Sequence, residues 1–167
     1  MHVAESFDDH HSGATAVTIF FKGDQLTVAN VGDCRAVLGE RRGKKVIAFS
    51  LSVDHTAYRR DERERIKACG ARVMTEAMAK GEEKYIADWE ETIFQDLEGT
   101  TKVPKIYSAT TTQPGFAFTR SLGDSGWTKI GIQAEPELLQ KQLREQDQFI
   151  VLATDGVWEY VTNQTVC

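Results

Sequence analysis

The sequence predicts an α+β protein built on a sandwich or layered sheet of antiparallel strands. Between residues 14 and 49, short segments rich in β-branched and aromatic residues follow one another closely, separated by turn signals such as Lys22-Gly23-Asp24 and Gly43. Between residues 56 and 69 the pattern changes to a charged segment with helical spacing. Strands joined by turns this short pair as antiparallel neighbours, and such a sheet needs a second layer to bury its apolar face.

Four strands are expected in the first third of the chain. They are Ala14–Phe21, Gln25–Val31, Arg35–Leu38 and Val46–Phe49. The first two form a hairpin, because the glycine and aspartate between them favour a tight turn. Gly32-Asp33-Cys34 interrupts the pattern before the third strand, and Gly39 is expected to end that strand.

A helix is expected from Thr56 to Cys69. Asp61 and Arg65 are four residues apart, as an ion pair on one helical face requires. Ile66 and Cys69 share a face of this helix, and Gly70 follows as a C-terminal cap. The charges of this segment are interpreted as a solvated helix face with no chemistry. Arg72–Met74 then returns to strand.

The segment from Thr75 to Pro114 is the least regular. A helix is expected at Glu82–Leu97, which carries Trp89 and Phe94. The segment has too few apolar residues to form a core of its own. We therefore interpret residues 75–114 as an insertion within a single domain that spans residues 1–167.

The last third contains the strand around which the prediction is organised. Phe149–Ala153 is apolar without a break and stops at Thr154-Asp155-Gly156, which fits a central, buried strand with the carboxylate of Asp155 at its mouth. Taken alone, Asp-Gly after a strand is more often a simple turn. Leu138–Leu143 is expected as a neighbouring strand, and Thr162–Cys167 as the capped start of a helix.

Composition excludes several classes of protein. Hydrophobic residues make up 41% and charged residues 27% of the 167 residues, which is typical of a folded globular protein. The net charge of −5 argues against nonspecific nucleic-acid binding, and no segment reaches membrane length. Cys34, Cys69 and Cys167 are odd in number and lack a Cys-x-x-Cys spacing. They favour a reducing compartment, so we expect a cytoplasmic location with the nucleus as the second candidate.

Near the start, Asp8, Asp9, His10 and His11 are residue types that bind metals. Adjacent side chains rarely converge on one ion, so we interpret this stretch as a solvated loop.

Four separated stretches are similar, in a fixed order, to motifs of the metal-dependent protein serine/threonine phosphatases of type 2C. They are Ser12-Gly13-Ala14-Thr15-Ala16 with Asn30-Val31-Gly32-Asp33-Cys34-Arg35-Ala36, Asp54-His55 with Glu62-Arg63-Glu64-Arg65-Ile66, Thr119-Arg120-Ser121-Leu122-Gly123-Asp124 with Glu135-Pro136-Glu137, and Asp155-Gly156-Val157-Trp158-Glu159. Each motif is moderately specific alone, and four in order make a strong signal. The run from Pro114 to Ser121 looks closest to large plant and protist members, some of them fused to cyclic-nucleotide-binding and kinase domains.

The resemblance implies a four-layer αββα sandwich, two antiparallel sheets flanked by helices, incomplete at both ends. It implies hydrolysis of phosphoserine and phosphothreonine in proteins by a water that bridges two Mn²⁺ or Mg²⁺ ions, as expected of hard cations with oxygen ligands. Asp155 corresponds to a ligand of that metal pair. Asp33 corresponds to a residue at a third, weaker site, and Glu159 stands where that site usually has an aspartate.

Other positions receive structural interpretations. Cys34 stands where the family usually has serine, and we interpret it as a small buried residue rather than a nucleophile. Arg120 is expected to pair with a carboxylate in the interior and not to bind phosphate. Without the resemblance, Asp33 and Asp124 would be interpreted as turn residues. The resemblance also implies that residues 75–114 form a flap near the catalytic cleft.

Several motifs of the family do not occur in these 167 residues. They are the N-terminal phosphate-binding arginine, the Phe-Asp-Gly-His-Gly-Gly segment and the C-terminal Asp-Asn. The catalytic residues are therefore unknown, and we expect the chain to correspond to the middle of a phosphatase domain that binds divalent metal weakly and is inactive by itself.

Three hypotheses follow for function. The first is part of an active phosphatase that acts on phosphorylated proteins in signalling. The second is a pseudophosphatase that keeps the scaffold as a protein-binding module, and the third is an unrelated β-rich interaction domain. The presence of Asp33 together with Asp155 favours the first, because a scaffold has no need of carboxylates at strand mouths.

Overall fold

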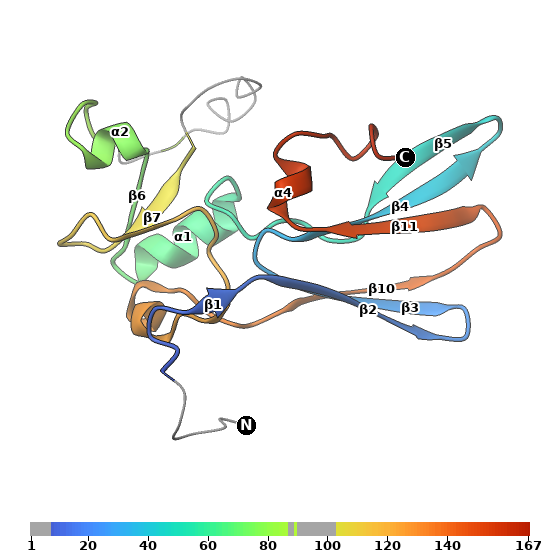
Figure 1. Ribbon diagram of the computed structural model, residues 1–167, viewed down its shortest axis with the longest axis horizontal. Helices are drawn as coiled ribbons and strands as arrows, with labels where there is room; N and C mark the ends of the chain where they lie inside the picture. Colours follow the sequence, from blue (N-terminus) through green and yellow to red (C-terminus); the bar gives the residue numbers. More distant parts are fainter. Residues whose placement is uncertain (1–7, 87–88, 90–102) are drawn as a thin grey trace. The chain divides into compact units, whose positions relative to one another are not determined.

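The computed structural model describes residues 8–86, 89 and 103–167 (Figure 1). The chain folds as two compact units. One, here called the sandwich unit, comprises residues 14–54 and 134–167, and the other, here called the mixed unit, comprises residues 1–13 and 55–133. Each unit is therefore built from two separate stretches of the chain.

The sandwich unit contains two three-stranded antiparallel sheets. One has the order β10-β3-β2, and its strands are β2 (Ala16–Lys22), β3 (Gln25–Val31) and β10 (Glu137–Gln142). The other has the order β11-β4-β5, and its strands are β4 (Arg35–Arg42), β5 (Lys45–Ser50) and β11 (Asp147–Ala153). Short turns connect β2 to β3 and β4 to β5, as antiparallel neighbours allow.

An apolar core lies between the two sheets. β3 contributes Leu26 and Val28, β4 contributes Ala36 and Leu38, and Leu51 follows β5. Side chains two residues apart along a strand point to the same face of the sheet. The alternation of apolar residues in the sequence therefore produces this core. The expected strands and the α+β class are thus confirmed.

The length of β4, in the sheet β11-β4-β5, differs from the sequence prediction. Gly39 does not end its strand, and β4 continues to Arg42. A Cβ atom at Gly39 would lie 2.5 Å from Cζ of Phe149, so the glycine leaves room for the aromatic ring of the neighbouring strand. Glycine here serves a close approach inside the sheet and not a turn.

The strand β11 was expected at the centre of a sheet, and that expectation is wrong. Among the described residues it lies at an edge and pairs with β4 alone. Phe149 remains 40% exposed. The central strand is β4, whose residues from Ala36 to Glu40 are all buried. A short apolar run indicates burial of a strand but does not fix its place in the sheet.

The segment after β11 forms the short helix α4 (Asp155–Trp158) and then a hydrogen-bonded turn. The helix expected at Thr162–Cys167 is not formed. The amide of Thr165 donates to the carbonyl and hydroxyl oxygens of Thr162 at 3.0 and 3.2 Å. The side chain of Gln164 accepts from the amide of Ala48 at 3.1 Å and donates to the carbonyl of Val46 at 3.0 Å, which satisfies backbone groups on the edge of β5.

The mixed unit has one three-stranded sheet with the order β6-β7-β8. Its elements are α1 (Arg60–Ala68), β6 (Arg72–Met74), α2 (Glu76–Ala79), β7 (Lys105–Tyr107), β8 (Pro114–Phe116), β9 (Leu122–Gly123) and the 3₁₀ helix η1 (Ser125–Ile130). The two-residue strand β1 (Gly13–Ala14) pairs with β9. Its first residue, Gly13, is the last residue of the stretch 1–13 of the mixed unit. No helix in the described part of the chain is long and apolar enough to cross a membrane.

The segment from residue 75 to residue 114 belongs to the mixed unit. Met78 of α2 and Ile106 and Tyr107 of β7 enter the apolar core of that unit. The helix expected at Glu82–Leu97 lies largely outside the described residues, and its described beginning, Glu82–Ile86, is not helical. The described parts of the segment are thus packed on the unit through a few apolar side chains.

The charged face of α1 is only partly solvated, which corrects the sequence interpretation. The expected pair of Asp61 with Arg65 is not formed: Asp61 accepts from Arg59 at 2.5 Å, and Arg65 donates to Glu62 at 2.7 Å. Glu62 is only 1% exposed. A buried carboxylate requires partners, and these come from distant parts of the unit.

Glu62 accepts hydrogen bonds from three side chains. Arg120 donates at 2.6 Å and Thr119 at 2.5 Å, in addition to Arg65. This confirms the structural pairing expected for Arg120. Burial of Glu62 by itself raises its pKa, but the hydrogen bonds from Arg120, Arg65 and Thr119 outweigh burial, and the pKa is held well below its usual range.

We predict that Glu62→Gln lowers the free energy of unfolding by about 3 kcal/mol at pH 7, because it leaves two arginines without their buried counter-charge. A depressed carboxyl pKa stabilises the fold above the unfolded value of about 4.3 and loses this effect as the pH falls below it. The difference between wild type and variant should therefore shrink below about pH 4. Urea denaturation at several pH values measures both effects.

The matched control is Glu64→Gln. Glu64 lies on the same helix and pairs with Arg60 at 2.9 Å on the exposed surface, so its loss should cost less than about 1 kcal/mol. Equal losses for the two variants would contradict a special role for the buried network.

Candidate metal centre

The pairing of β4 with β11 brings two carboxylates to one end of a sheet. In the antiparallel register Ala153 lies opposite Arg35, so the start of β4 and the end of β11 are neighbours. Asp33 stands two residues before Arg35, and Asp155 stands two residues after Ala153. Residues far apart in the sequence therefore meet at the same strand end.

The turn before β4 places Asp33. Gly32 has a φ of 92°, a left-handed conformation that suits glycine, and Asp33 is 9% exposed. The pKa of Asp33 is raised, first by burial and second by the negative charge of Asp155. Two carboxylates that repel each other in this way form an arrangement that a cation stabilises.

Asp155 begins α4 immediately after β11, and its side chain is exposed. Glu159 follows one helical turn later, and its amide donates to the carbonyl of Asp155 at 2.9 Å. The Glu159 side chain is exposed as well. Of the three metal ligands expected from sequence, the structure thus brings Asp33 and Asp155 into electrostatic contact.

Asp33 and Asp155 fit a hard divalent cation in ligand type and in charge. Within residues 8–86, 89 and 103–167, however, no group of three or more histidine, cysteine, aspartate or glutamate side chains is arranged to hold a metal ion. The described residues would therefore supply only two ligands to a metal ion, Asp33 and Asp155, and any further ligands would have to be water or other groups.

Cys34 and Thr15 lie beside this carboxylate pair. The thiol is buried and lies 3.2 Å from the hydroxyl of Thr15. Burial raises the pKa of the Cys34 thiol, so it stays protonated at neutral pH and is no nucleophile. This agrees with the interpretation of Cys34 as a small buried residue.

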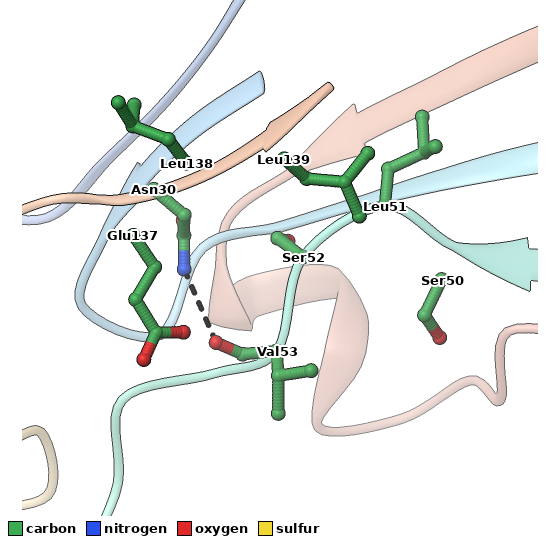
Figure 2. A pocket seen from close by; sticks show the side chains of 8 residues that line it. All are labelled: Asn30, Ser50, Leu51, Ser52, Val53, Glu137, Leu138 and Leu139. Carbon is green, nitrogen blue, oxygen red and sulfur yellow. Dashed lines mark hydrogen bonds between the residues drawn. The ribbon is translucent and has the colours of Figure 1, made fainter. Parts of the chain in front are cut away.

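Asn30, at the end of β3, supports the turn that carries Asp33. Its side-chain amide donates to the carbonyl oxygen of Gly32 at 3.2 Å. It also donates to the carbonyl oxygen of Val53 at 3.4 Å (Figure 2). It borders a cavity of about 150 Å³ that Glu137 and Leu139 also line. Ligand pockets for small molecules usually exceed about 300 Å³. The role of Asn30 is thus to connect two loops.

Sequence reasoning missed a cluster around Arg35. Its guanidinium contacts Asp54, Asn163 and the ring of Trp158, which come from three other segments of the sandwich unit. One signal was available in the sequence: an arginine at the first position of a buried strand needs a partner. The identity of that partner depends on the fold.

The loop at Asp8–His11 forms a turn in the mixed unit. Asp9 accepts a hydrogen bond from the hydroxyl of Ser125 at 2.5 Å, and His11 packs on Trp127 with ring centroids 5.8 Å apart. These residues make contacts within the mixed unit.

The motif aspartate Asp124 is also used inside the mixed unit. It has a φ of 52° and accepts from the hydroxyl of Ser121 at 2.8 Å. A Cβ atom at Gly13 would lie 1.9 Å from the Asp124 carboxylate, so only glycine fits there. Two of the motifs that resemble the phosphatases therefore meet at this corner as structural partners.

Two antiparallel sheets packed on an apolar core, with Asp33 and Asp155 at one end of adjacent strands, define an α+β sandwich protein. The chain belongs to the protein phosphatase 2C family, whose family model matches residues 1–167. The sequence resemblance to this family is thereby confirmed.

Two curated relatives illustrate the similarity. Probable protein phosphatase 2C 35 of Arabidopsis thaliana is 41% identical over 160 residues, which are 95% of this chain and 45% of that protein. Probable protein phosphatase 2C 64 of Oryza sativa subsp. japonica is 36% identical over 161 residues, which are 95% of this chain and 33% of that protein. The chain thus spans less than half the length of these relatives.

A solved structure shares the fold. The crystal structure of serine-threonine phosphatase 2C from Toxoplasma gondii superimposes with a TM-score of 0.70 at 20% sequence identity, covering 92% of this chain and 45% of that chain.

We predict that Asp155→Asn lowers the pKa of Asp33 in the metal-free protein and raises the melting temperature at pH 7. A carboxyl group with a raised pKa costs stability as the pH rises from about 3.9 through its folded value. Removing the charge of Asp155 reduces that cost. Carbon-13 NMR titration of the Asp33 carboxyl and thermal unfolding in a chelator measure the two effects.

Glu159→Gln is the control, because it removes a charge from the end of the same helix. It should change the pKa of Asp33 less than Asp155→Asn does. An Asp33 pKa that does not respond to Asp155→Asn would show that the two carboxylates are not coupled.

Proposed function

We propose that the protein to which this chain belongs hydrolyses phosphoserine and phosphothreonine in other proteins with the help of Mn²⁺ or Mg²⁺. The carboxylate pair of Asp33 and Asp155 carries the proposal, because its mutual repulsion favours a bound cation. Membership of the protein phosphatase 2C family and the names of the curated relatives support the reaction type.

For Asp33, Asp155 and Glu159 we propose the metal-binding roles that the family resemblance implies. Asp155 would hold one ion of a metal pair, and Asp33, together with Glu159, would hold a third and weaker ion. A bound pair of divalent ions supplies an acidified water and neutralises charge on the phosphoryl group. The chain's own contribution is to hold the carboxylates at the ends of paired strands, where the Thr15 hydroxyl contacts the thiol of Cys34, the residue after Asp33.

The substrate would be a phosphorylated protein. We propose that residues 1–167 form part of one phosphatase domain and that residues 75–114 act as its flap. The described part of this segment lines a hollow of about 410 Å³ in the mixed unit, in which Glu76 lies 2.7 Å from Lys80 and 3.5 Å from Lys105. Two ammonium groups share one carboxylate there, which leaves positive charge to meet an acidic substrate segment.

We also propose a subgroup and a location for the protein. The run from Pro114 to Ser121 favours the plant and protist members fused to regulatory or kinase domains, and the cysteine pattern favours a cytoplasmic or nuclear location. The relatives described above are named as phosphatases, which favours an enzyme over a pseudophosphatase scaffold.

The complete protein with Asp155→Asn should lose at least about 100-fold in kcat/KM toward a phosphothreonine peptide, since even residues that only support metal ligands cost 10–100-fold when removed. The amide keeps the shape of the carboxylate but lacks its charge. Phosphate release in Mn²⁺ measures the activity, and circular dichroism verifies the fold.

Asp24→Asn is the matched control, because Asp24 lies in the exposed turn between β2 and β3 of the same unit. It should retain wild-type activity. Near-wild-type turnover of Asp155→Asn would refute its role as a ligand, and a wild-type protein without turnover on any phosphopeptide would favour the scaffold.

A flap that contacts protein substrates should affect large substrates more than small ones. We expect the double variant Lys80→Ala/Lys105→Ala to lower kcat/KM toward an acidic phosphoprotein by about 3- to 10-fold, as loss of rim charges does in other interfaces. Turnover of p-nitrophenyl phosphate should not change. Lys129→Ala, an exposed lysine on η1, is the control, and equal effects on both substrates would contradict the flap.

A further inference from the structure

Arg35 is the first residue of β4, at the end of the sheet where the two carboxylates of the candidate metal centre come together. It stands two residues after Asp33, which lies in the turn before β4, and it pairs with Ala153, which stands two residues before Asp155. Its side chain therefore begins where the two ligand-bearing segments come together.

The guanidinium group of Arg35 forms a fork with Asp54. Nε lies 2.8 Å from Oδ1 and Nη2 lies 2.6 Å from Oδ2, so both carboxylate oxygens are bound. The remaining nitrogen, Nη1, donates to Oδ1 of Asn163 at 2.8 Å. Such two-pronged pairing matches the planar group of arginine and cannot be reproduced by lysine.

The face of the same guanidinium covers Trp158. Its central carbon lies 5.2 Å from the centroid of the Trp158 ring, within the range of a cation–π contact. Trp158 is 8% exposed, and its indole nitrogen donates to the carbonyl of Ala153 at 2.9 Å. Trp158 is the last residue of α4, and Asp155 is the first.

The helix α4 has only four residues. A helix of this length is not stable by itself, because too few hydrogen bonds offset the cost of ordering its backbone. Its position must come from contacts with the sheet. Arg35 supplies two of them, one through Trp158 and one through Asn163 in the turn that follows.

Arg35 also acts on charge. Asp54 is a third carboxylate of the sandwich unit, and its side chain is only 18% exposed. The fork with Arg35 places a positive charge directly against Asp54 and occupies both of its oxygens. Asp54 is thereby kept in a defined ion pair with Arg35.

We propose that Arg35 is a positioning residue for the Asp33–Asp155 pair: it fixes α4 against the sheet and holds Asp54 in an ion pair. The inference rests on the proposed function, because it assigns these carboxylates to metal binding. A purely structural ion pair is the alternative, and it would affect stability without affecting metal affinity.

The first test uses the metal-free complete protein with Arg35→Lys, which keeps the charge but loses the fork and the planar face. The amides of Val157, Trp158 and Glu159, which close α4, should exchange with solvent at least about 10-fold faster, whereas amides in the middle of β4 should not. Unchanged exchange in α4 would overturn the proposal without touching the proposed function.

The second test is Mn²⁺ binding by titration calorimetry. Arg35→Lys should raise the Kd about 10- to 100-fold, as loss of residues that orient metal ligands does. Asn163→Ala, which removes one contact of Arg35 and no charge, should raise it by a smaller factor. Arg42→Lys is the matched control, because Arg42 lies on the same strand and pairs with Glu40 at 2.8 Å on a more exposed surface.

The outcomes separate the two claims. A lower melting temperature of Arg35→Lys with an unchanged Kd would show a structural ion pair and overturn the proposal. If Arg35→Lys does not fold, Asn163→Ala decides, and an unchanged Kd in that variant likewise overturns it. A wild-type protein that binds no Mn²⁺ would instead refute the proposed function and, with it, this inference.

Discussion

The antiparallel pairing of β4 with β11 is the constraint on which the candidate site depends. Because Ala153 lies opposite Arg35, the turn at Asp33 and the helix that begins at Asp155 are fixed to the same end of one sheet. Backbone hydrogen bonds set this register, and a shift by one residue would turn every side chain to the other face. The distance between the two carboxylates is therefore controlled by the sheet rather than by flexible loops.

The two units use buried charge in different ways. In the mixed unit Glu62 is surrounded by Arg120, Arg65 and Thr119, and its negative charge is stabilised by the protein itself. In the sandwich unit Asp33 faces another carboxylate, and its charge is disfavoured. The first arrangement stabilises the fold. In the second arrangement, a bound cation would offset the repulsion between the two carboxylates. Opposite pKa shifts thus distinguish a structural carboxylate from a candidate ligand.

Arginine performs the same task in both units. Arg120 and Arg35 each lie within a stretch that resembles a family motif, and each binds a carboxylate from a distant part of the chain with more than one nitrogen. The planar guanidinium connects several segments at once, which a lysine cannot do. The motifs that resemble the phosphatases therefore contain structural residues as well as candidate metal ligands.

Local patterns in the sequence were sufficient for much of the fold. The strands Gln25–Val31 and Arg72–Met74 agree in both bounds, since alternation and turn residues act over neighbouring positions. The ordered motifs were sufficient to identify the family and to select Asp33 and Asp155. Gly39 was misjudged because its use depends on Phe149, which lies in a strand more than a hundred residues later.

What the sequence determined by itself was the main strands of the sandwich unit and the helix α1, the family and the candidate carboxylates. Tertiary structure decided that β4 and not β11 is central, that Glu62 is buried, and that Arg35 contacts Asp54, Asn163 and Trp158. The physical reason is the separation along the sequence over which each property acts. Propensity, turns and periodicity are properties of adjacent residues, whereas strand order, burial of charge and ion pairing depend on segments that meet only when the chain has folded.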